Sequence, residues 1–253
     1  DVSGGGWYAV AREDEMVRFQ LEKRRGQSRV KTSAFYSLPE AVLRDPQTLP
    51  LESARIAFRD VTKNDNSRTM VCALVPPHTV LVHKAPYLLR RRGSEADEAY
   101  LLGVLSSIPY DWFTRRFVEL TMSFALLSTF PVPRVDPDTG WRLDMGGNAL
   151  DLVDFRHVRN RVVELAGSLA AADARYVDWA KAVGVDVNNL LDREDAEAEL
   201  DALIALLYGL PREGLAQIYA TFHRGWDYRQ RLVSAEAHHA AWLDRLDGKG
   251  VFS

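Results

Sequence analysis

The chain has 253 residues, of which 47% are apolar and 26% are charged. A chain of this length and composition buries a substantial hydrophobic core, as soluble globular proteins do. No apolar run reaches the roughly 18 to 20 residues that span a bilayer, and residues 1–10 lack the basic and then apolar order of a signal peptide. We therefore expect a cytoplasmic protein without membrane contact, and the Asp at position 1 predicts a piece of a longer polypeptide.

Cysteine and histidine usage argues against a metal protein. The sequence holds one cysteine, Cys72, and six histidines. A lone thiol forms no internal disulfide and supplies too few ligands for a cysteine-based zinc site. The histidines show neither His-Glu-x-x-His nor another metal-ligand spacing. We expect no metal site, and we expect Cys72 to serve as a small apolar residue in a strand.

Charge is divided unevenly along the chain. Residues 1–135 carry 19 Lys and Arg against 15 Asp and Glu, whereas residues 136–253 carry 13 against 20, which together give the net charge of −3. A polyanion would therefore meet the first part of the chain. A split this mild also arises by chance, so the charge pattern alone does not establish that the chain binds a polyanion.

The first part of the chain is expected to contain a small sheet. Residues 55–62 and 68–75 are rich in β-forming residues and flank the turn-forming residues 63–67, which predicts a β-hairpin. A third strand is predicted over residues 79–83. Residues 1–50 are expected to be irregular, with one or two short strands.

Helices are expected to follow the sheet. Ser94, followed by acidic residues, is typical of a helix N-cap. Pro109 is expected to end or kink that helix and to begin a second one that reaches residue 117. Residues 121–127 are expected to be extended or irregular. Apolar residues at helical spacing predict further helices over residues 150–183, 192–208, 211–222 and 228–246.

These elements predict an α+β protein of two domains. Residues 1–135 would hold a small twisted antiparallel sheet with helices, and residues 136–253 would form an all-helical C-terminal domain that braces the first.

Catalytic motifs are missing from the sequence. An S-adenosylmethionine-dependent amino-methyltransferase needs a glycine-bearing turn from strand to helix and an Asp/Asn/Ser-Pro-Pro-Tyr/Phe tetrapeptide. The nearest match to this tetrapeptide is Val75-Pro76-Pro77-His78. It lacks both the polar first residue and the aromatic last residue, and we interpret it as a turn that ends a strand. Neither an acid-x-Lys nuclease pattern downstream of Asp136 nor a Gly-x-Ser-x-Gly elbow occurs. We expect no active site in this chain.

Several segments, taken in order, resemble a known family. The main ones are Arg-Ile-Ala-Phe-Arg-Asp-Val-Thr at 55–62, Asn-Ser-Arg-Thr-Met at 66–70, Ala-Leu-Val-Pro-Pro at 73–77, Lys-Ala-Pro-Tyr-Leu at 84–88, Tyr-Leu-Leu-Gly-Val-Leu at 100–105, Asp-Trp at 111–112, Phe-Pro-Val-Pro at 130–133, Leu-Tyr-Gly-Leu at 207–210 and Thr-Phe-His-Arg-Gly-Trp-Asp-Tyr at 221–228. Their order is similar to the C-terminal target-recognition region of N6-adenine DNA methyltransferases. These include type IIG restriction-modification enzymes and related phage-defence methylases.

The resemblance implies a function in DNA recognition. The chain would choose the site at which a separate catalytic domain of the same polypeptide, bound to S-adenosylmethionine, methylates adenine. It would hold no cofactor itself, and its partners would be double-stranded DNA, that catalytic domain and further defence-system subunits. The chain departs from the family at Ser123, where such proteins often carry Asn, and within residues 1–50, which match nothing in it.

In such a region, the sheet and its loops would lie against the duplex. Arg and Lys grip phosphates, whereas Arg and Asn also read base edges. Asn64 and Asn66 would pair with adenine and Arg68 with guanine; alternatively, the asparagines only make the turn and Arg68 forms an ion pair with Asp60. The full set of expected DNA-binding residues is Arg59, Lys63, Asn64, Asn66, Arg68, Lys84, Arg90, Arg91, Arg92, Arg115, Arg116 and Ser123.

The sequence also fits two other functions. The five arginines at 90–92 and 115–116 also fit solvated charges at helix ends. A second hypothesis is a protein-interaction module, whose acidic helical residues 150–246 assemble a defence complex without direct DNA contact. A nuclease with scattered ligands ranks last.

Overall fold

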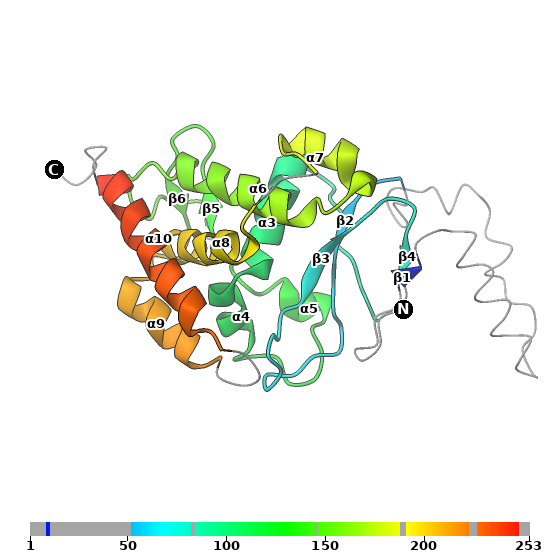
Figure 1. The fold of residues 1–253 in the computed structure, drawn as a ribbon, viewed down its shortest axis with the longest axis horizontal. Helices are drawn as coiled ribbons and strands as arrows, with labels where there is room; N and C mark the ends of the chain where they lie inside the picture. Colours follow the sequence, from blue (N-terminus) through cyan, green and yellow to red (C-terminus); the bar gives the residue numbers. More distant parts are fainter. Residues whose placement is uncertain are drawn as a thin grey trace, which may run out of the picture.

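The computed structural model describes residues 9–10, 52–81, 84–144, 146–187, 191–222 and 227–247. Within these ranges the protein is mixed α/β, with short antiparallel strand pairs and a larger helical part (Figure 1). The expected irregular region, residues 1–50, lies outside the described residues except for the short strand β1, Ala9–Val10.

A buried hairpin forms the centre of the first part. Strands β2, Arg55–Phe58, and β3, Cys72–Val75, pair antiparallel, with Arg55 opposite Val75 and Phe58 opposite Cys72. The hairpin predicted from the β-forming residues is therefore confirmed. All four residues of β2 are buried, so this strand is covered on both faces.

The third strand differs from the expectation. Strand β4, Val80–Leu81, pairs with β1 and not with the hairpin. Two prolines and His78, which has a φ of 57°, turn the chain away after β3. Residues 86–88 lie beside β2 instead, where the Phe58 backbone N–H donates to the Pro86 carbonyl (2.9 Å) and Leu88 donates to Ile56 (2.8 Å).

Two helices follow without a loop between them. Helix α3, Glu95–Ser106, begins with a capping box in which Ser94 and Asp97 satisfy each other's backbone N–H, which confirms the expected N-cap. Ser107 ends α3 and also caps α4, Ile108–Thr114, whose first turn contains Pro109. The expected break at the proline is therefore present.

Residues 121–127 are not wholly extended, contrary to expectation. A short helix α5, Phe124–Leu127, begins after Ser123, whose hydroxyl accepts a hydrogen bond from the Leu126 N–H (3.1 Å). A serine at this position satisfies one of the free donors of the first helical turn.

The second part is mostly helical. It contains α6, Arg156–Ala170; the 3-10 turn η2, Ala174–Tyr176; α7, Val177–Val183; α8, Arg193–Leu207; α9, Arg212–Ala220; and α10, Arg229–Asp247. The expectation of an all-helical domain was incomplete, because β5, Arg134–Val135, pairs with β6, Arg142–Leu143. The expected stop at Gly184 is confirmed by its left-handed φ of 87°.

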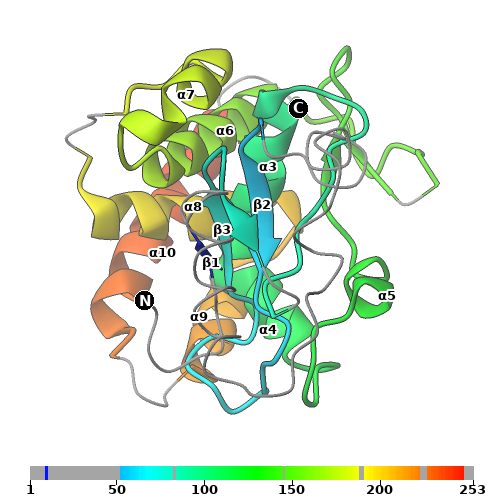
Figure 2. The same ribbon diagram turned by 90° about the vertical axis from the view of Figure 1, so that its right-hand side faces the viewer.

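The two parts share one hydrophobic core. Helix α8 is in contact with α4, α6 and α10, and α3 packs against both α6 and β3 (Figures 1 and 2). The Tyr176 hydroxyl donates to the Leu74 carbonyl (2.9 Å), and the Trp179 indole N–H donates to Glu98 (2.9 Å). One buried cluster includes apolar residues from both parts, so a division into two domains at residue 135 is not confirmed.

The shared core predicts one cooperative unfolding transition. Leu102→Ala in α3 and Leu203→Ala in α8 should each lower the free energy of unfolding by about 2 to 5 kcal/mol, because both side chains are buried. Leu152→Ala, at a side chain that is 66% exposed, is the control. Urea unfolding followed by circular dichroism and tryptophan fluorescence measures this; two separate transitions, each shifted by only one of the core variants, would contradict it.

Candidate nucleic-acid interface

The loop between β2 and β3, residues 59–71, is anchored by a buried carboxylate. Asp111 in α4 has no exposed surface. Its carboxylate accepts hydrogen bonds from the backbone N–H groups of Thr69 (3.0 Å) and Met70 (2.9 Å) and from Nε of Arg68 (2.5 Å). A buried carboxylate needs partners of this kind to offset the loss of its hydration. The loop therefore rejoins β3 in one fixed position relative to α4.

Arg68 is part of this anchor. Besides Asp111, its guanidinium donates to the carbonyl oxygens of Ser106 (2.6 Å) and Ser107 (3.3 Å) at the end of α3. The alternative ion-pair partner considered from sequence, Asp60, contacts Lys84 instead, with 3.6 Å between Nζ and Oδ2. In this conformation Arg68 holds the loop against α3 and α4.

Two further arginines brace the loop, Arg59 from within it and Arg115 from the end of α4. Arg59 donates through Nη2 to the Thr62 hydroxyl (2.9 Å) and to the Arg68 carbonyl (3.0 Å). Arg115 donates through Nη2 to the carbonyls of Asn66 (2.7 Å) and Ser67 (3.0 Å), and its guanidinium lies 4.0 Å from the centre of the Phe222 ring. Burial lowers the pKa of both arginines.

The tip of the loop presents polar side chains to solvent. Lys63, Asn64 and Asp65 are exposed. In the orientation of the Asn66 amide that satisfies its neighbours, its oxygen accepts from Nη2 of Arg59 (3.0 Å) and from the Lys63 backbone N–H (3.1 Å), so this amide is partly used to shape the turn. Arg116 is also exposed, and its guanidinium lies 4.3 Å from the centre of the Trp112 ring.

A second loop lies beside the first. The Thr62 N–H donates to the Leu120 carbonyl (3.0 Å), and the Met122 N–H donates to the Asp60 carbonyl (2.8 Å). This second loop, between α4 and α5, carries two exposed apolar side chains, Phe117 and Leu120, which are 55% and 61% exposed. These apolar residues were not among those expected at the interface.

The structure therefore separates the expected DNA-binding residues into two groups. Residues 86–88 run antiparallel to β2, so Arg90, Arg91 and Arg92 lie beyond the Arg55 end of this strand. The loops described above lie beyond the Phe58 end. Arg90 is also paired with Glu95. The group at the loop end comprises Arg59, Lys63, Asn64, Asn66, Arg68, Lys84, Arg115, Arg116 and Ser123.

Sequence reasoning missed Asp111 as a positioning residue. It appeared only within the resemblance, as part of Asp-Trp. A charged residue next to Tyr110, in a short helix rich in apolar residues, is a signal that the carboxylate is buried and needs partners. Sequence alone gives no indication that these partners lie in the loop before β3.

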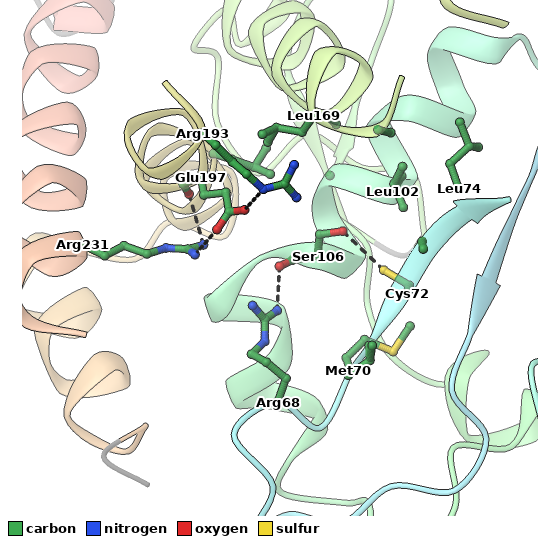
Figure 3. Close-up of a pocket in the computed structure, with 16 residues that line it drawn as sticks. Arg68, Met70, Cys72, Leu74, Leu102, Ser106, Leu169, Arg193, Glu197 and Arg231 are labelled. Atoms are coloured by element: carbon green, nitrogen blue, oxygen red, sulfur yellow. Dashed lines mark hydrogen bonds and ion pairs between the residues drawn. The ribbon is translucent and has the colours of Figure 1, made fainter. Parts of the chain in front are cut away.

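A cavity lies behind the anchor, between β3, α3, α6, α8 and α10 (Figure 3). Its volume is about 320 Å³, and its walls include Leu102 and Leu169 together with Arg68, Arg193 and Arg231. Cys72 also lines it, with Sγ 3.3 Å from the Ser106 hydroxyl. The expected role of Cys72 in a strand is confirmed, because it begins β3.

Neither metal chemistry nor a known relative identifies the site. Among the described residues, no group of His, Cys, Asp and Glu has an arrangement that could hold a metal ion. None of the helices in the described ranges combines the length and apolar character needed to cross a membrane. No family model matches the chain, and neither a curated protein nor a solved structure matches it.

The anchor predicts a large loss of stability in Asp111→Ala. Removal of the carboxylate leaves the Arg68 charge and two backbone N–H groups without their partner, which should cost about 3 to 5 kcal/mol in the free energy of unfolding. Asp178→Ala, at an exposed position in α7, is the matched control. Urea denaturation measures both variants, and equal midpoints for the two would contradict the anchoring role.

Proposed function

We propose that this chain is the DNA sequence-recognition module of an S-adenosylmethionine-dependent, adenine-specific DNA methyltransferase whose catalytic domain lies elsewhere in the polypeptide. The segments quoted above follow one another in the same order as in these methyltransferases, and this resemblance supports the proposal. The observation that carries the proposal is the braced loop of residues 59–71, which holds a polar, hydrogen-bonding tip in one position at the surface.

The geometry supports the loop tip, and not the sheet face, as the contact surface. Because β2 is buried on both faces, it offers no surface to a duplex. Asn64 has the amide that pairs with an adenine edge in the major groove, and Lys63 and Arg116 are the exposed cations that would contact phosphates.

The internal arginines have a different part in this proposal. Arg59, Arg68 and Arg115 hold the loop through hydrogen bonds inside the protein. A loop that is ordered before binding loses less conformational entropy in the complex, which favours affinity. We therefore assign these three residues to positioning and reserve direct contact for the tip.

Salt dependence tests the electrostatic part of the proposal. The chain should bind duplex DNA at low salt, and Lys63→Ala combined with Arg116→Ala should reduce the slope of log K against log salt by about 1.8, because each phosphate contact contributes about 0.9. Lys181→Ala with Arg229→Ala, two exposed cations on helices α7 and α10, is the matched control. Fluorescence anisotropy across a salt series measures this, and the proposal fails if the unchanged chain binds no duplex.

Base reading is tested separately, in the intact methyltransferase. Asn64→Ala should relax the choice of base at one position of the methylated site, because a bidentate pair with adenine contributes about 1 to 3 kcal/mol of discrimination. Asn160→Ala, at an exposed position in α6, is the control. Sequencing of methylated adenines measures site choice; an unchanged pattern with Asn64→Ala would remove this residue from the proposal.

One observation favours the second candidate, a protein-interaction module. Leu150 and Leu152 are 61% and 66% exposed in the segment before α6, an arrangement that suits a protein contact. If the chain binds no DNA and Leu150→Asp with Leu152→Asp releases it from its partner domain or subunit, the interaction module is the better description.

A further inference from the structure

The cavity behind the loop is lined by two chemically different groups of side chains. One group is apolar and includes Leu74, Leu102, Leu169 and Leu200. The other group consists of the three arginines and Glu197. The cavity volume of about 320 Å³ lies at the lower end of the range for small-molecule sites, which are mostly apolar with a few well-placed polar groups.

The charged lining residues include more positive than negative side chains. Arg68, Arg193 and Arg231 line the cavity with a single carboxylate, that of Glu197. Glu197 contacts Arg231 (2.5 Å) and Nε of Arg193 (3.1 Å). Asp111 and Asp201 bind two of these arginines from behind and do not line the cavity.

Arg193 is the arginine best placed to receive a ligand. Its side chain is 69% exposed, and its contact with Glu197 uses Nε. Figure 3 shows the rest of the Arg193 guanidinium directed away from Glu197, toward the space beside Ser106. In the same view, the Arg68 guanidinium lies below Ser106. An anionic group between these two guanidinium groups would accept charge-assisted hydrogen bonds.

We propose that this cavity binds a small amphipathic anion, with a carboxylate or similar head group between Arg193 and Arg68 and a short hydrocarbon chain along Leu102 and Leu169. The apolar walls would contact the hydrocarbon chain of the ligand, and the guanidinium groups would bind its head group. The argument for this site does not rely on the proposed DNA contact. Because Arg68 also holds the loop through Asp111, an occupant would touch the residue that positions the loop tip.

The chain contains its own reporter for this cavity. Cys72 is the single cysteine of the sequence and lines the cavity, so covalent labelling of a thiol reports on this site alone. Burial raises the pKa of the Cys72 thiol to about 11. The thiolate is the reactive form, so labelling should be slow at neutral pH and should rise about tenfold for each pH unit until the pH approaches this pKa.

The experiment uses the full chain with octanoate, 1-octanol and inorganic phosphate as probes. Octanoate should bind in calorimetry and should slow alkylation of Cys72 by N-ethylmaleimide several-fold, whereas the neutral alcohol and the bare anion should each protect much less. Arg193→Ala should weaken octanoate binding about tenfold, as expected for loss of one charge-assisted contact, and Arg193→Lys should restore part of it. Arg175→Ala, at an exposed arginine outside the cavity, should bind octanoate unchanged.

Three results would overturn the proposal. These are the absence of both heat and protection with millimolar octanoate, equal protection by 1-octanol, and unchanged octanoate binding in Arg193→Ala. Arg193 is exposed and outside the core, so its substitution should leave the fold intact, and the circular dichroism spectrum of each variant checks this. Calorimetry decides the outcome even where alkylation is slow.

Discussion

The arrangement of the first part of this protein depends on one buried carboxylate. Asp111 connects the first turn of α4 with the backbone of the loop that enters β3, and it binds Arg68, which in turn binds the end of α3. A buried charge is tolerated only where its hydrogen-bonding capacity is filled. The positions of the hairpin, the loop and two helices are therefore coupled through a single side chain.

The helical part contains a second coupling of the same kind. Asp201 of α8 has no exposed surface and accepts hydrogen bonds from the Ile108 backbone N–H (2.8 Å), the Tyr219 hydroxyl (2.5 Å) and Arg231 (2.8 Å). It thus joins α4, α8, α9 and α10. Helix α4 takes part in both couplings and therefore connects the hairpin loop to the helical part, in addition to the hydrophobic core that the two parts share.

The sequence predicted local features well and long-range contacts poorly. The hairpin, the Ser94 cap and the stop at Gly184 follow from residue types within a few positions, and each is confirmed. The partner of β4 and the pairing of residues 86–88 with β2 depend on contacts distant in sequence, and they were wrong or missing. For the candidate site, the sequence predicted a polar loop between the two hairpin strands, and the structure places that loop at residues 59–71. The sequence could not distinguish arginines that hold the loop from those at its surface, because both kinds have the same side chain.

The hydrogen bonds that shape the loop join the backbone of residues 66–70 to the side chains of Asp111 and Arg115 in and just after α4. The side chains of Lys63 and Asn64 are outside this framework. Over evolution, these two residues could therefore be substituted with little change in the free energy of unfolding. New surface chemistry would then evolve on an unchanged support.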